Sequence, residues 1–399
     1  MRRTGDLKLI QELNRSIILD TIRHYGPISR TEIAKRHQLS PTTVTTAVQE
    51  LIQEGLVGEG GIGQSSGGRK PKLVQFLPDR HFMIGVAIKK SSLIVSEMNL
   101  EANVRRKIHV PVQTNGPKVI EEVIEVLQAF MKHTASLDKC AGIAVITQGV
   151  VDASEGVVRH NSKMNLFNVP IKRMFEDAFH LPVYVDNDTN AFILAEKNFN
   201  SFDSCKNMLY VTVGDGVGAG IIVNGDIYRG RGGGAGEFGH TSIDRHGELC
   251  ECGSRGCLEN YVSWPAIQTR IFSHITKGAT SPMVEAAQGD ILKMTLPLFI
   301  RSLKDKDPLA VMINDEVAKN LAIGITNLVH LFNPEKVILG GELVYENESL
   351  YNQVKVHLEK NTLHPMAKGL KVQMTSLEGN FDMLGAASVL LQDKFNFSL

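Results

Sequence analysis

A cluster of side chains that bind metals lies in the second half of the sequence. Cys250, Cys252 and Cys257 fall within eight residues, and His240 precedes them. One imidazole and three thiolates make up a closed tetrahedral zinc site, so the pattern predicts one structural Zn²⁺ ion per chain. Four protein ligands leave no open coordination position, which favours a structural over a catalytic role. The alternative is three unpaired core cysteines beside an incidental histidine.

Polar residues that could bind hydroxyl groups accompany this cluster. Residues 186–190 (DNDTN) directly follow the apolar run 183–185, and the carboxyl end of a strand is where α/β folds place ligands. An Asn and an Asp can hold a polyol hydroxyl, and the Asp could take its proton. An Asx-rich turn that caps a helix over 191–197 explains the same residues equally well. Glu237 and Glu259 flank the zinc ligands and are available to bind hydroxyls.

Apolar runs that read as strands alternate with helical stretches from residue 81 onward, which predicts an α/β architecture. The expected strands are 82–88, 93–98, 141–146, 183–185, 208–213, 219–223 and 337–339, and the expected helices are 119–133 and 308–331.

The first 78 residues read as a separate domain. Leu9, Leu13, Ile17 and Ile18 recur at helical spacing, and residues 25–27 (YGP) end that helix. Residues 29–32 (SRTE) form a capping box for a short second helix. Ser40 caps a third helix, whose face of short polar side chains would contact DNA. The expected DNA-contacting residues of this helix are Ser40, Thr42, Thr43, Thr45, Thr46 and Gln49.

A glycine-rich hairpin follows the third helix. Residues 55–68 contain seven glycines, and Arg69 and Lys70 come next. A flexible hairpin tipped with cations after a recognition helix is typical of a wing, and both cations could enter the minor groove. The sequence therefore predicts a winged helix-turn-helix. The alternative is a small helical bundle with a solvated loop.

The charge of the whole chain hides this division. Lys plus Arg and Asp plus Glu both number 43, yet residues 1–78 contain 11 basic and 7 acidic side chains, a net charge of +4. The remainder carries −4, so overall neutrality does not exclude DNA binding. No run of about 18 apolar residues and no signal peptide are apparent, so we expect a cytoplasmic protein without membrane insertion.

The residues 236–240 (GEFGH), the three clustered cysteines and Asn187-Asp188 together resemble the ROK family of repressors and sugar kinases. The resemblance covers essentially the whole chain. Within the family, the N-terminal head is similar to the repressor branch of N-acetylglucosamine, glucose and xylose repressors. Residues 25–30 and 331–336 resemble the N-acetylglucosamine and glucose repressors most. The resemblance implies a bilobal, actin-like (ribonuclease H-like) fold with a sugar in the interlobe cleft, near residues 187–260.

The resemblance also implies roles for individual residues. Asn187, Asp188, Glu237, His240 and Glu259 would contact sugar hydroxyls, and Asp188 matches the catalytic base of the kinases. His240 would bind zinc through one ring nitrogen and a sugar hydroxyl through the other.

One part of the kinase pattern is missing. Where the kinases have an Asp-x-Gly-Gly-Thr phosphate loop, this chain has Ala87, Ile88, Lys89, Lys90 and Ser91. The carboxylate is gone, and two lysines replace glycines that let phosphates approach the backbone. Asp215 stands where the second phosphate loop usually has Thr, although Gly340-Gly341 is kept. We therefore expect no enzymatic phosphoryl transfer.

The leading hypothesis is a sugar-responsive repressor of carbohydrate genes, with DNA-binding domain 1–78 and sugar-binding domain 79–399. Its partners would be operator DNA, a sugar or sugar phosphate, and a second or further copies of the chain in a homodimer or homotetramer. The alternatives are an ATP-dependent sugar kinase with a regulatory head, and a repressor released by a protein partner, for example of the phosphotransferase system.

Overall fold

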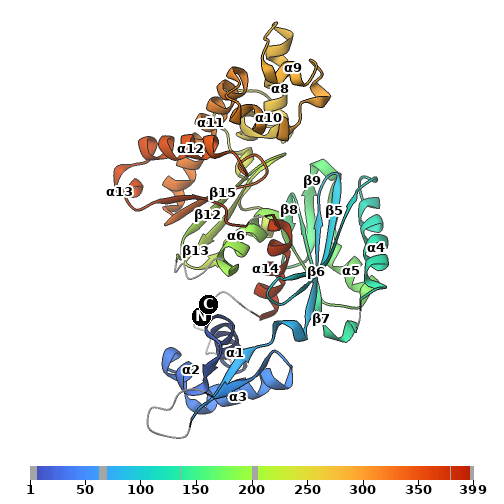
Figure 1. Ribbon diagram of the computed structural model, residues 1–399, viewed down its shortest axis with the longest axis vertical. Helices are drawn as coiled ribbons and strands as arrows, with labels where there is room; N and C mark the ends of the chain where they lie inside the picture. Colours follow the sequence, from blue (N-terminus) through green and yellow to red (C-terminus); the bar gives the residue numbers. More distant parts are fainter. Residues whose placement is uncertain (1–6, 63–69, 135, 200–204, 378, 396–399) are drawn as a thin grey trace. The chain divides into compact units, whose positions relative to one another are not determined.

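The computed structural model describes residues 7–62, 70–134, 136–199, 205–377 and 379–395 of the chain (Figure 1). The chain forms two compact units. The first consists of Met1–Phe199 and Asn380–Leu399, and the second of Asn200–Gly379. The chain thus leaves the first unit after residue 199 and returns to it at residue 380.

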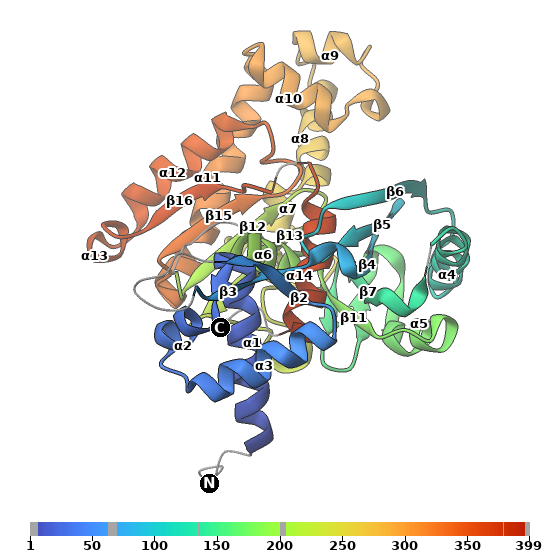
Figure 2. The same ribbon diagram turned by 60° about the horizontal axis from the view of Figure 1, so that its bottom comes forward.

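The N-terminal head of the first unit is a winged helix-turn-helix (Figure 2). Its elements are α1 (Leu7–Tyr25), β1 (Ile28–Ser29), α2 (Arg30–His37), α3 (Pro41–Gln53), β2 (Val57–Ile62) and β3 (Lys72–Phe76). The strands form an antiparallel sheet in the order β1-β3-β2, and β2 and β3 are the wing. Ile18, Val44 and Val48 are fully buried between the helices, whereas Leu9 and Leu13 are exposed. The helical period of α1 was therefore predicted correctly, but its first two turns do not contribute to the core.

Serine caps fix where the second and third helices begin. The Ser29 hydroxyl accepts a hydrogen bond from the Glu32 amide at 3.2 Å, which is the serine half of the predicted capping box. The Ser40 hydroxyl accepts one from the Thr43 amide at 3.0 Å, with Pro41 in the first turn of α3. Between these helices Gln38 adopts a left-handed conformation (φ 54°), which ends α2 and makes the tight turn.

The rest of the first unit is built on a five-stranded sheet with the order β11-β7-β4-β5-β6. Its strands are β4 (Phe82–Ile88), β5 (Ser92–Asn99), β6 (Val104–Pro111), β7 (Cys140–Thr147) and β11 (Val183–Asn187). All of β4 is buried, as expected for a central strand covered on both faces. In Figure 1, α4 (Lys118–Met131) and α5 (Ile171–Phe179) lie on one side of this sheet, and α6 (Asp188–Phe199) and α14 (Phe381–Phe395) on the other. A smaller sheet contains β8 (Val150–Asp152), β9 (Val157–Asn161) and β10 (Leu166–Val169).

The second unit has its own five-stranded sheet, in the order β14-β13-β12-β15-β16. The strands are β12 (Met208–Val213), β13 (Val217–Val223), β14 (Asp226–Ile227), β15 (Lys336–Gly340) and β16 (Lys371–Met374). The helices are α7 (Glu259–Val262), α8 (Trp264–Thr276), α9 (Pro282–Ala286), α10 (Leu296–Lys304), α11 (Pro308–Phe332), α12 (Glu348–Asn361) and α13 (His364–Ala367). A core cluster of buried residues from this sheet and these helices includes Val211, Ile313, Val317 and Leu339.

The Asx cap weighed for residues 186–190 is present, and the element bounds on either side differ from those expected. β11 continues past residue 185 to Asn187, and α6 begins at Asp188 rather than at residue 191. Asn187 caps this helix, because its side-chain oxygen accepts from the amides of Thr189 and Asn190. No helix in the described part of the chain has the length and apolar character needed to cross a membrane.

Candidate functional site

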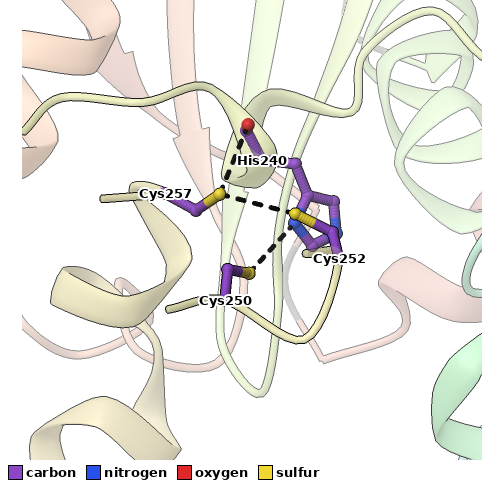
Figure 3. A group of neighbouring side chains, drawn as sticks. All are labelled: His240, Cys250, Cys252 and Cys257. Atoms are coloured by element: carbon purple, nitrogen blue, oxygen red, sulfur yellow. Dashed lines mark hydrogen bonds between the residues drawn. The ribbon is translucent and has the colours of Figure 1, made fainter. Parts of the chain in front are cut away.

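Four potential metal ligands converge in the second unit (Figure 3). The ligand atoms of His240, Cys250, Cys252 and Cys257 all lie within 4.8 Å of one another. His240 ends the short 3-10 helix Phe238–His240, and the cysteines lie on the loop that leads into α7. Gly256 has a φ of 67°, and a Cβ there would be 1.7 Å from the Asp244 carbonyl oxygen. Only glycine can therefore bring this loop into its close turn.

The spacing of these atoms fits a tetrahedral zinc ion. The Cys252 and Cys257 sulfur atoms are 3.6 Å apart, and the Cys250 sulfur is 3.6 Å from Nδ1 of His240. Zn–S bonds of about 2.3 Å at the tetrahedral angle separate two sulfur atoms by about 3.8 Å. A metal ion bound by this donor set would tie the loop to the Phe238–His240 turn.

The pKa values of the three thiols bear on whether the cluster binds a cation. Burial and the neighbouring thiols raise the pKa of Cys257 to about 12, and burial raises the pKa of Cys250. A backbone hydrogen bond at Ser254 lowers the pKa of Cys252 to about 7. Three thiolates in one cluster repel one another, so a bound divalent cation is what would let all three ionise.

The second ring nitrogen of His240 faces a candidate sugar ligand. Nε2 lies 3.9 Å from a carboxylate oxygen of Glu237, while Nδ1 faces the sulfur atoms. Glu259, the first residue of α7, accepts a hydrogen bond from the Val217 amide at 2.9 Å. Its carboxylate also lies beside Gly239, where a Cβ would be 3.2 Å from Oε2. The second unit thus brings Glu237, His240 and Glu259 to one place, next to the metal ligands.

The other two candidate sugar ligands lie in the first unit, where β11 meets α6. The Asn187 amide nitrogen donates to the Gly149 carbonyl at 2.9 Å, while its oxygen caps α6. The Asp188 carboxylate accepts from the Thr189 amide at 2.8 Å. Desolvation is the main reason that the pKa of Asp188 rises to about 6. This carboxyl can therefore exchange a proton with a hydroxyl near neutral pH more readily than an ordinary aspartate.

An ion pair that sequence reasoning missed stands beside Asp188. The Lys89 ammonium lies 3.0 Å from Oδ2 of Asp382, in the first turn of α14. The carboxylate of Asp382 raises the pKa of Asp188, and Lys89 lowers it, so the three charges are neighbours. Lys89 also lies over the ring of Phe381, 4.9 Å from its centroid. Nothing in the sequence pattern signals this pair, because its members are far apart in the chain.

The structure also places the other residues that align with the phosphate loops of the kinases. Ala87 is buried within β4, and Lys90 is exposed. Asp215 is exposed in the turn between β12 and β13. A Cβ at Gly341 would be 2.4 Å from the Val213 carbonyl oxygen, and one at Gly340 would meet the Tyr210 hydroxyl. Close packing alone therefore requires glycine at both positions, whether or not a nucleotide binds there.

The expected DNA-contacting residues lie on the outer part of α3 and on the wing. Ser40, Thr42, Thr46 and Gln49 are exposed, as is Lys70 before β3. Two other threonines use their hydroxyls locally: Thr43 bonds Ser40 at 2.8 Å, and Thr45 donates to the Pro41 carbonyl at 2.8 Å. Arg69 lies outside the described residues.

The head and the body together define a DNA-binding regulator built on a sugar-kinase-like, actin-like α/β fold. The chain belongs to the ROK family, whose model matches residues 83–393, and residues 13–58 match the MarR family. It is 30% identical over 396 residues to the xylose repressor of Caldicellulosiruptor bescii, covering 98% of this chain and 99% of that one.

Two further relatives support this assignment. The chain is 28% identical to the N-acetylglucosamine repressor of Escherichia coli O157:H7, covering 94% of this chain and 91% of that one. The motifs of the sequence pointed to this repressor, yet the identity to the xylose repressor is slightly higher. The crystal structure of a ROK family transcriptional regulator, a homolog of the E. coli MLC protein, superposes with a TM-score of 0.87 at 27% identity, covering 97% of both chains.

Proposed function

We propose that this protein is a transcriptional repressor of carbohydrate uptake or catabolism genes, and that a sugar or sugar phosphate controls its affinity for operator DNA. The observation that carries the proposal is the combination in one chain of a winged helix-turn-helix with a ROK-family body. We infer that this body keeps the sugar-binding residues and that Lys89, paired with Asp382, fills the position of the phosphate loop. Two relatives of similar length are named xylose repressor and N-acetylglucosamine repressor.

The ion pair of Lys89 and Asp382 supports a role without phosphoryl transfer. A phosphate loop needs small residues that let the phosphates approach backbone amides. Here a lysine side chain stands at that position and already has a carboxylate partner at 3.0 Å. A nucleotide would have to displace this carboxylate from Lys89 and find room beside it.

Five residues are the proposed sugar ligands. Asn187 and Asp188 would bind hydroxyls at the start of α6, and Glu237, His240 and Glu259 would bind others. Zinc, bound by the three cysteines and Nδ1 of His240, would supply a fixed positive charge that orients the imidazole. Nε2 of His240 then points toward Glu237 and is available to a hydroxyl group.

The head would bind DNA as part of a symmetric assembly. Residues 1–78 would be the DNA-binding domain and 79–399 the sugar-binding domain, in a cytoplasmic homodimer or homotetramer. Two heads on a two-fold axis would match half-sites about one helical turn apart, so a sugar that changes their spacing would release the operator. Ser40, the exposed polar residues of α3, Arg69 and Lys70 would make the contacts.

A binding titration tests this proposal. Duplexes enriched from a random library by the protein itself serve as probe, at fixed salt, with D-xylose, D-glucose, N-acetylglucosamine and the 6-phosphates of the two hexoses. At least one ligand should weaken DNA binding by about tenfold or more, and Asp188→Asn should bind DNA normally without this response. Unchanged affinity with every ligand would refute direct sugar control and favour release by a protein partner. ADP production that Asp188→Asn abolishes would instead identify a sugar kinase.

A further inference from the structure

We propose that helix α6 couples sugar binding to the orientation of the DNA-binding head, and that Arg23 of α1 is the positioning residue through which the head follows this helix. The inference rests on the proposed function, because it takes Asn187 and Asp188 as sugar-binding residues. The two ends of α6 carry the argument.

The first end of α6 is built from the candidate sugar ligands. Asp188 is its first residue, and the oxygen of Asn187 accepts from the amides of Thr189 at 2.8 Å and Asn190 at 3.2 Å. Asn190 in turn donates to the buried carboxylate of Asp186 at 3.1 Å. A hydroxyl that binds Asn187 or Asp188 therefore pulls directly on the first turn of the helix.

The body of α6 is packed so that it can move only as a whole. Nine of its twelve residues are buried. Phe192 packs edge-to-face on Phe381 of α14, with centroids 5.4 Å apart, and a Cβ at Gly385 would be 3.1 Å from the Ala191 Cβ, a tight contact. A short, close-packed helix transmits a displacement along its axis rather than absorbing it.

The last turn of α6 contacts the head. The Arg23 guanidinium donates to the Asn198 carbonyl at 3.3 Å and lies over the ring of Phe199, 5.4 Å from its centroid. Its side chain is only 7% exposed, and Asp20 lies 3.9 Å away on the same face of α1. A carbonyl at a helix C-terminus carries partial negative charge, so an arginine there is favourably placed.

Helix α1, which carries Arg23, also contacts α2 and the end of α3, the two helices of the helix-turn-helix. The Thr21 hydroxyl and the His37 ring of α2 are 2.7 Å apart, and Arg15 pairs with Glu54 at the end of α3. The connection to the body at residues 78–81 is fixed separately, because Asp79 accepts from Asn99 at 2.8 Å and from Arg105 at 3.1 Å. This connection can act as a pivot, and the Arg23 contact determines the angle of the head about it.

The test compares three arginine variants and one ring variant in full-length protein. DNA affinity is measured with the library-enriched duplex, with and without saturating D-xylose or N-acetylglucosamine, together with sugar affinity. We expect Arg23→Ala to leave sugar affinity and sugar-free DNA affinity within about threefold of wild type, yet to lose most of the sugar-induced release. Phe199→Leu should do the same and add little to Arg23→Ala, and Arg23→Lys should restore part of the response. The control Arg15→Ala removes a contact within the head and should respond as wild type.

The outcomes separate this inference from the function on which it rests. If wild type responds to a sugar and both Arg23→Ala and Phe199→Leu keep the full response, the coupling is refuted and the repressor function stands. If wild type responds to neither sugar, direct sugar control fails. Hydrogen exchange of the α6 amides then tests whether α6 and the head are coupled. DNA should then slow exchange of the amides at 188–191 in wild type but not in Arg23→Ala. Equal exchange with and without DNA in wild type would refute the coupling.

Discussion

The ammonium group of Lys89 lies 3.0 Å from the carboxylate of Asp382, and this pair joins the end of β4 to the first turn of α14. Asp382 is 7% exposed, and burial raises the pKa of its carboxyl. A buried carboxylate costs stability unless a cation or hydrogen-bond donors compensate it. Lys89 is thus part of the folded structure of the first unit.

Lys89→Met should lower the free energy of unfolding by about 1–3 kcal/mol, because it leaves the Asp382 carboxylate without its cation. Urea unfolding at pH 7 measures this. Arg301→Ala is the control, since its pair with Asp305 is exposed and contributes about 0.5 kcal/mol or less. The double variant Lys89→Met/Asp382→Leu should be more stable than Lys89→Met alone. Additive losses would contradict a direct interaction.

Sugar binding should depend on pH through Asp188. The pKa of its carboxyl is about 6, so above pH 6 it is ionised and accepts hydroxyl hydrogen bonds. Below pH 6, sugar affinity should fall by up to about tenfold per pH unit. Folding stability should change with pH in the opposite direction to sugar affinity. Because the pKa is raised in the folded state, the cost of burying this charge is present above pH 6 and is relieved as the pH falls toward 4.

Calorimetric sugar titrations and urea unfolding between pH 5 and pH 8 check both directions. In Asp188→Asn this pH dependence should disappear. If the variant keeps the wild-type profile, another group titrates.

Removing the metal should disorder the loop that carries the cysteines and abolish sugar binding. Cys257→Ser replaces a fully buried ligand, so metal content should fall from one zinc per chain to none. Native mass spectrometry measures the zinc, and the sugar titration measures the consequence. Cys140→Ser is the control, because Cys140 lies in β7 of the other unit. An unchanged zinc content in Cys257→Ser would refute the assignment.

The wing should contribute charge and little sequence specificity. Lys70→Ala should weaken binding of all duplexes similarly and reduce the salt slope by about 1, as the loss of one phosphate contact does. Gln49→Ala on α3 should instead cost about 1–3 kcal/mol on the enriched duplex only. Affinity titrations from low to high salt on enriched and random duplexes separate the two effects. An identical loss on both duplexes for Gln49→Ala would place it away from base edges.

The local structure was largely predictable from the sequence because local rules determine it. The Ser29 and Ser40 caps, the bounds of α3 and the apolar run of β4 follow from residue type and spacing alone. The Asx cap at 186–190 could be read from the sequence, but the bounds of β11 and α6 could not, because Asn187 caps the helix while it still belongs to the strand. Residue patterns do not show where a strand ends when its last residue is also the cap of a helix.

The candidate sites also divide into those that local sequence predicts and those that depend on the tertiary fold. The cluster of potential metal ligands was predictable because its members are close in the chain, and the structure brings all four together. The contacts of Lys89 with Asp382 and of Arg23 with Phe199 depend on the topology, in which α6 and α14 pack together. A single sequence carries no pattern that pairs such distant residues.

The return of the chain to its first unit has a consequence for synthesis. The head is complete once residue 76 has left the ribosome, but the faces of β4 and β7 that α14 covers stay bare until residues 381–395 follow the whole second unit. A nascent chain can therefore fold its DNA-binding part well before its sugar-responsive part. Translation that stops before residue 380 would leave a head without a working body, a fragment able to occupy DNA without any means of release.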